Sequence, residues 1–124
     1  MNDLAYFEGT RYQSLRIQTE KEFDISKIEK GLISIHANWS GQSIINGKHI
    51  LDTIQKSDFK NVEIHILDID IMSLQDQIEL IGDICHGYFE SIWIERGEVD
   101  FVFKDNHSNT GLQDFVLYLK SKLS

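Results

Sequence analysis

The chain contains no proline and a single cysteine, Cys85, among its 124 residues. One cysteine cannot form a disulfide within the chain, so a secreted, disulfide-stapled protein is not indicated. No apolar run approaches the roughly 20 residues that a membrane helix needs. The first ten residues hold two acids and no apolar run of signal-peptide length. We therefore expect a cytoplasmic protein with no membrane partner.

Basic residues are also scarce. Lys and Arg number 12 against 20 Asp and Glu, which gives a net charge of −8. Nucleic-acid binding depends on clustered Lys and Arg, so this composition argues against a nucleic-acid partner. Simple solubility and a basic partner are both open as explanations of the acidity. The hydrophobic share of 41% and the length suit one soluble globular domain.

Hydrophobic periodicity predicts strands at residues 12–18, 32–37 and 61–68. A hairpin is predicted at residues 91–95 and 98–103, around Arg96-Gly97. Helices are predicted from a capping box at Thr19 to Ile28, over residues 43–57, from a cap at Ser73, and over residues 112–123. This order predicts an α/β fold, with a mixed sheet of four to five strands flanked by four helices. We expect one domain over residues 1–124, in which residues 1–12 could form an N-terminal arm.

The stretch at residues 33–54 is the opening of a βαβ unit: an apolar strand, a sharp turn and an amphipathic helix. The turn reads Trp39-Ser40-Gly41-Gln42-Ser43. At these five positions the chain resembles the thioredoxin family, whose signature is Trp-Cys-Gly-Pro-Cys. Further landmarks in the same order are Asp68-Ile69-Asp70 at a strand end, Gly97-Glu98-Val99 at a hairpin turn, and Gly111 to Phe115 at the last helix. The resemblance covers residues 14–123 and implies a thioredoxin-like fold.

The same resemblance implies that the redox chemistry is lost. Ser40 and Ser43 stand where thioredoxins carry their two thiols, and a Ser hydroxyl cannot exchange with a disulfide. Ser34 matches the family's buried acid and Ile66 its lysine partner. Phe89 matches the cis-proline beside the site, and we expect a trans peptide bond before it. We predict that the protein is not a redox enzyme and binds no cofactor.

Three other groups of residues could carry chemistry. Ser40 with His36 could form a nucleophile and base, although capping of the helix is the simpler role for Ser40 or Ser43. No metal site is expected, because His36, His49, His65, His86 and His107 have no ligand spacing, and the acids Asp68, Asp70 and Asp76 suit a solvated turn. Cys85 is expected to be a buried, inert residue. The alternative is a thiol-dependent enzyme or redox sensor that uses Cys85 alone.

The remaining hypothesis is binding. In a thioredoxin-like fold the turn and the loop at Tyr88-Phe89 would meet on one surface, and aromatic residues dominate binding hot spots. We therefore predict a protein-binding module of the chaperone, assembly-factor, adaptor or inhibitor type, with an unidentified protein partner. The predicted contact residues are Trp39, Ser40, Gly41, Gln42, Ser43, Tyr88 and Phe89.

Overall fold

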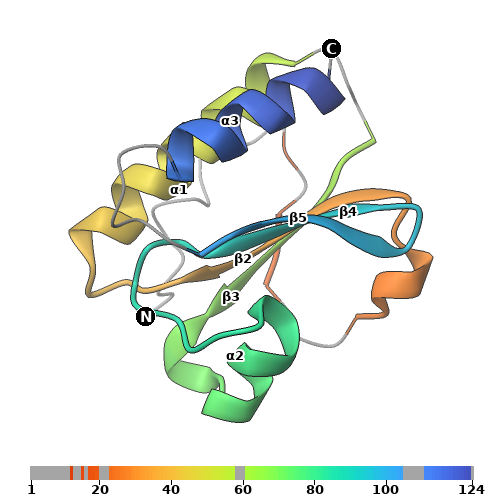
Figure 1. Ribbon diagram of the computed structural model, residues 1–124. Coiled ribbons are helices and arrows are strands. Elements are labelled where there is room, and N and C mark those ends of the chain that lie inside the picture. Colours follow the sequence, from red (N-terminus) through yellow and green to blue (C-terminus); the bar gives the residue numbers. More distant parts are fainter. Residues whose placement is uncertain are drawn as a thin grey trace.

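A five-stranded mixed sheet with the order β1-β3-β2-β4-β5 runs through the middle of the protein (Figure 1). The computed structural model describes residues 12, 15, 17–19, 23–57, 61–104 and 111–123. Strands β1 (Ile17–Gln18), β3 (Glu63–Asp68) and β2 (Lys30–His36) are parallel. Strands β4 (Ser91–Glu95) and β5 (Glu98–Phe103) are antiparallel to their neighbours. The predicted mixed α/β sheet is confirmed.

Helices cover both faces of the sheet (Figure 1). On one face, α1 (Gly41–Lys56) and α3 (Gly111–Lys122) enclose a core with Leu32, Ile50 and Phe115. On the other face, α2 (Leu74–Ile81) and the short 3-10 helix η1 (Ile25–Lys27) cover a second core with Ile33 and Ile92. Alternate residues of β2 point to opposite faces, which is why its run of apolar residues serves both cores. No helix in the described part of the chain is long and apolar enough to span a membrane.

The first predicted helix is wrong over the described residues. Four helices were expected, but residues 23–28 contain only the single 3-10 turn η1. The Asp24 side chain accepts hydrogen bonds from the backbone N–H and the hydroxyl of Ser26, at 3.0 and 2.6 Å. Such local side-chain bonds compete with α-helical hydrogen bonding. Ile28 is already extended, and its strand follows at once, so no room remains for a further helical turn.

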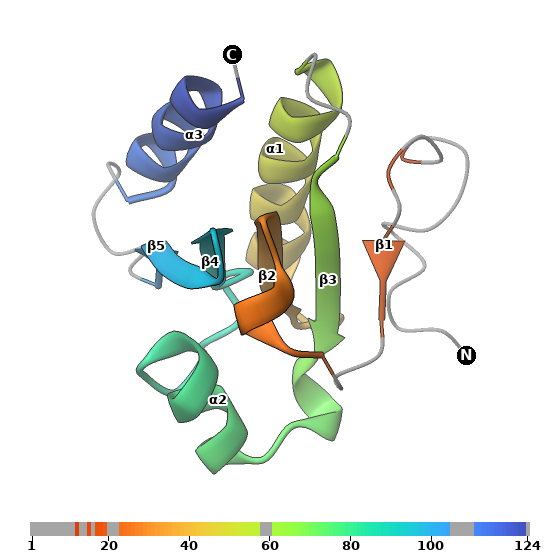
Figure 2. The same ribbon diagram turned by 90° about the vertical axis from the view of Figure 1, so that its right-hand side faces the viewer.

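The carboxyl ends of β2 and β3 lie at the same end of the sheet. The start of α1 follows β2, while the 3-10 helix η2 (Ile69–Ile71) and then α2 follow β3. All three therefore gather at one end of the protein, the lower end in Figure 2. The loop between α2 and β4 returns to the same place. This arrangement brings the predicted turn and loop together.

Candidate functional site

Ser40 is the N-cap of α1 and also joins the turn to the loop before β4. Its Oγ accepts a hydrogen bond from the backbone N–H of Ser43 at 3.3 Å, as capping requires. The same hydroxyl donates to the carbonyl oxygen of Gly87 at 2.6 Å. The hydroxyl proton of Ser40 is thus used within the protein. Ser40 both caps α1 and links the turn to the loop through Gly87.

Ser43 lies behind Ser40 and is fully buried. Its Oγ accepts from the backbone N–H of Ala37 at 3.1 Å and lies 2.8 Å from Nδ1 of the buried His36. His36 therefore contacts Ser43 and not Ser40, the serine weighed as a nucleophile. A hydroxyl enclosed in this way cannot meet a substrate, so the pair offers no support for a serine hydrolase.

The loop at residues 86–90 is held by a buried carboxylate. The buried Glu90 accepts a hydrogen bond from the backbone N–H of Tyr88 at 3.0 Å through one carboxylate oxygen. The other carboxylate oxygen accepts from the backbone N–H of His86. The loop is also fixed from both sides: Asn46 Nδ2 donates to the Tyr88 carbonyl at 2.8 Å, and the Ile35 N–H donates to the Glu90 carbonyl at 2.9 Å. Buried carboxylates and amides need such partners, and here they fasten the loop to α1 and β2.

Phe89 differs most from the prediction. Its preceding peptide bond is trans, as expected, but its φ is +62°, and its ring is completely buried. The left-handed backbone costs a bulky residue about 1–3 kcal/mol and persists only where the surroundings enforce it. The hydrogen bonds of Asn46 and Glu90 on either side do this, and the ring becomes part of the core between the sheet and α1. Phe89 therefore offers no side-chain surface to a partner.

Two buried serines, Ser34 and Ser91, lie next to the loop. Ser91 Oγ donates to the Phe89 carbonyl at 2.7 Å, and Ser34 Oγ lies 2.6 Å from Ser91 Oγ. Because Ser91 has used its only proton, Ser34 is the donor in that second bond. Ile66 lies directly opposite Ser34 on β3. Ser34, Ser91 and the Phe89 carbonyl therefore form a chain of neutral hydrogen bonds that supports the loop.

Trp39 is the outer part of the site. Its side chain is 62% exposed, yet two contacts hold it in place. The indole N–H donates to Asp70 Oδ1 at 3.2 Å, and the far edge of the ring lies against Gly87. A Cβ at residue 87 would come within 3.0 Å of Trp39 Cη2, and φ there is +82°, so this position suits glycine.

The seven predicted contact residues are thus brought together but divided by depth. Trp39, Gly41 and Gln42 are exposed, and Ser40 and Tyr88 are half-buried. Ser43 and Phe89 are buried and cannot touch a partner directly. Sequence reasoning missed Asn46 and Glu90, which hold the loop. A signal for Asn46 was its spacing of three residues from Ser43 and four from Ile50 on the inner side of α1.

Cys85 is 7% exposed and faces the core beneath α2. Burial above all, and then the negative charges of Glu90 and Asp83, raise the pKa of its thiol to about 12. A reactive thiol needs the opposite environment, one that lowers the pKa. The expected burial of Cys85 is confirmed.

Metal ligands do not converge in the described part of the chain, where no group of three His, Cys, Asp or Glu side chains could hold an ion. His36 and His65 lie on neighbouring strands but on opposite faces, since His65 pairs with Ile33 and its ring packs, tilted, against Phe23. His65 bonds Glu63 at 2.6 Å. His107 lies outside the described residues.

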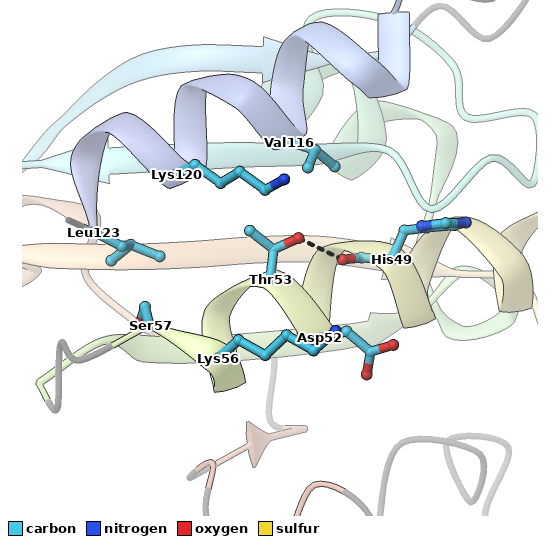
Figure 3. Close-up of a pocket in the computed structure, with 8 residues that line it drawn as sticks. All are labelled: His49, Asp52, Thr53, Lys56, Ser57, Val116, Lys120 and Leu123. Carbon is cyan, nitrogen blue, oxygen red and sulfur yellow. Dashed lines mark hydrogen bonds between the residues drawn. The ribbon is translucent and has the colours of Figure 1, made fainter.

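A groove of about 620 Å³ lies between α1 and α3 (Figure 3). Lys56 and Lys120 border it from the two helices, while the nearby Asp52 accepts a hydrogen bond from Tyr12 at 2.9 Å. Thr53 is turned to its own helix, where its hydroxyl donates to the His49 carbonyl at 2.8 Å. The groove lies along the second half of α1, away from Trp39, and carries charges of both signs. We assign it no role.

Solved structures with the same architecture include thioredoxins. The chain matches thioredoxin O2 from Arabidopsis thaliana with a TM-score of 0.65 at 16% identity, over 94% of this chain and 100% of that one. Mitochondrial thioredoxin 3 from Saccharomyces cerevisiae gives a TM-score of 0.60 at 19% identity, over 88% and 99%. No protein-family model and no curated protein sequence matches the chain. The chain therefore has the thioredoxin fold, as its sequence landmarks predicted.

Proposed function

We propose that this protein is a redox-inactive thioredoxin-like domain that binds a protein partner through the outer surface of the turn. The contact residues are Trp39, Ser40, Gly41, Gln42 and Tyr88. One observation carries the proposal: Trp39 is largely exposed and yet held by Asp70 and Gly87. An exposed aromatic ring that is already ordered loses little conformational entropy on binding, which is the property of an interface anchor.

The interior of the site supports the loss of redox chemistry. Both thiol positions are serines, and their hydroxyls are engaged in capping and bracing α1. The raised pKa of Cys85 disfavours the alternative of a single-thiol enzyme, because the thiolate is the reactive form. What remains at the surface is suited to binding, in the manner of a chaperone, assembly factor, adaptor or inhibitor, in the cytoplasm.

Site-specific photocrosslinking tests the binding surface. A photoreactive amino acid at Gln42 should give a covalent adduct with one protein partner in cells, and Trp39→Ala in the same chain should remove most of it. Leu117 on α3 provides a matched position, because its side chain is also 62% exposed. An equally strong adduct of the same protein at position 117, or one insensitive to Trp39→Ala, would contradict the proposal.

Insulin reduction by dithiothreitol tests the absence of redox activity. The protein should not accelerate the reaction above the blank. Ser40→Cys with Ser43→Cys should restore little activity, because Ser34, Ile66 and Phe89 still occupy the positions of the acid, the lysine and the proline. Acceleration by the unmodified chain would refute redox inactivity.

A further inference from the structure

The negative charge of this protein is concentrated in one segment. Residues 61–95 contain no Lys or Arg and eight acids, while the rest of the chain holds 12 acids and 12 bases and is neutral in sum. Three of the eight lie on the strands or in the loop before β4: Glu63 bonds His65, Glu95 pairs with Lys30, and Glu90 accepts hydrogen bonds in the loop. The other five, Asp68, Asp70, Asp76, Glu79 and Asp83, belong to the end of β3, to η2, and to α2 and its C-terminal end.

The same segment exposes large apolar side chains. Leu74 and Ile78 lie one turn apart on α2 and are exposed, because Gln77 and Ile81 form the buried side of that helix. Ile71, just before α2, is exposed as well. The hydrogen bond from Trp39 to Asp70 connects this ridge to the turn. We call Trp39, Ile71, Leu74 and Ile78, with the acids Asp70, Glu79 and Asp83, the α2 surface.

Exposed apolar side chains that lie beside a group of acidic residues indicate an interaction site more than simple solubility. The 12 acids elsewhere in the chain are balanced by 12 bases, whereas the acids near the apolar ridge have no Lys or Arg in their own segment. Lys104 lies beside this surface, with its Nζ next to Gly82 at the end of α2. Two copies of the chain would bring like charges together, which disfavours self-association through this face.

We propose that the α2 surface docks a basic amphipathic segment of the protein partner, one that carries Lys or Arg on one side and apolar residues on the other. The apolar side would desolvate against Leu74, Ile78 and Trp39, while the basic side would face the acids at the rim. This inference rests on the proposed function and names the chemistry of its partner.

Two designed amphipathic helical peptides of about 18 residues test the proposed basic partner directly. The peptides have the same apolar face and differ only in carrying Lys or Glu on the polar face. Trp39 is a built-in reporter, because the second tryptophan, Trp93, is fully buried. Its emission should shift with the Lys peptide at a concentration at least about tenfold lower than with the Glu peptide. The affinity for the Lys peptide should fall at least about tenfold between about 50 and 500 mM salt.

Charge reversal then locates the surface. The double variant Glu79→Lys with Asp83→Lys should bind the Lys peptide at least about tenfold more weakly. The helix itself should tolerate the change, because lysines at the C-terminal end of α2 interact favourably with the helix dipole. Glu29→Lys with Glu98→Lys is the matched control, since both residues lie beside the turn at Gly97, at the opposite end of the sheet. Each double variant has a net charge of −4 in place of −8. The control should change the affinity less than about twofold.

Equal weakening by both double variants would mean that net charge alone attracts the peptide, and would overturn the inference. Equal affinity of the unmodified protein for the two peptides would overturn it without any variant. If Trp39→Ala still abolished the crosslinked adduct at Gln42 in that case, the proposed function would stand and only the basic chemistry of the partner would fall. If the protein showed no preference for the Lys peptide and Trp39→Ala also left the crosslinked adduct unchanged, both proposals would be overturned.

Discussion

Trp39 and Phe89 belong to the two segments that meet at the end of the sheet, and the structure gives these aromatic rings opposite places. Trp39 is 62% exposed and lies across Asp70 and Gly87, whereas Phe89 is 0% exposed and packs in the core. The turn therefore contributes surface and the loop contributes stability. Ser40 caps α1 at the turn and the ring of Phe89 lies in the core, so only the outer side of the two segments is accessible.

The largest expected effect follows from removing the buried ring. Phe89→Ala should lower the free energy of unfolding by about 3–5 kcal/mol, because it leaves a cavity between the sheet and α1. Urea unfolding measures the change, and Phe89→Leu, which keeps most of the apolar volume, is the control. A loss below about 1 kcal/mol for Phe89→Ala would show that the ring is a surface group, and the contrast with Trp39 would fail.

The thiol of Cys85 should react slowly in the folded protein. With its pKa raised from 9.0 to about 12, labelling near pH 8 should be at least about 30-fold slower than after unfolding in guanidinium, even before shielding is counted. Because the pKa is raised on folding, the stabilising contribution of the neutral thiol is complete below pH 9 and is lost as the pH rises to 12. Rapid native labelling that levels off near pH 9 would instead favour the single-thiol alternative.

The two buried serines should differ in a way that tests the direction of their hydrogen bonds. Ser91→Ala removes the donor to the Phe89 carbonyl and the acceptor of Ser34, so it should cost about 1–3 kcal/mol of stability. Ser34→Ala leaves the bond from Ser91 to Phe89 intact and should cost less. Thermal unfolding of the two variants gives the order, and the reverse order would mean that Ser34 supports the loop by another route.

The smallest effect on stability is expected at the exposed ring. Trp39→Ala should change the free energy of unfolding by no more than about 0.5 kcal/mol, as is usual for surface positions. It should nevertheless weaken partner binding by about 1–3 kcal/mol, the range of an interface anchor. Leu117→Ala, at the same exposure, should leave both quantities unchanged. Destabilisation by Trp39→Ala comparable to that by Phe89→Ala would remove the distinction between surface and core.

Local sequence pattern determined most of the framework. The hairpin of β4 and β5 begins and ends at the predicted residues, since alternating apolar positions around Arg96-Gly97 are read directly from the chain. The cap of α2 at Ser73 was also predicted, because capping depends on neighbouring residues, whereas α1 begins at Gly41 and not at residue 43 as predicted. The prediction of the first helix failed because the Asp24 side chain forms a local hydrogen bond with Ser26. The periodicity of apolar residues does not reveal such a local side-chain bond.

Only the tertiary structure decided which aromatic ring faces outwards. Apolar and aromatic character is the same at Trp39 and Phe89, so composition and spacing alone do not separate them. The sign of φ at Phe89 is enforced by Asn46, which is 42 residues from Tyr88 in the chain, and by the bond between Ile35 and Glu90. The charge of residues 61–95 is fixed by the sequence, but the contact of Trp39 with Asp70 required the fold. Contacts between distant residues carry no local signal, which is why the depth of each site residue appeared only in three dimensions.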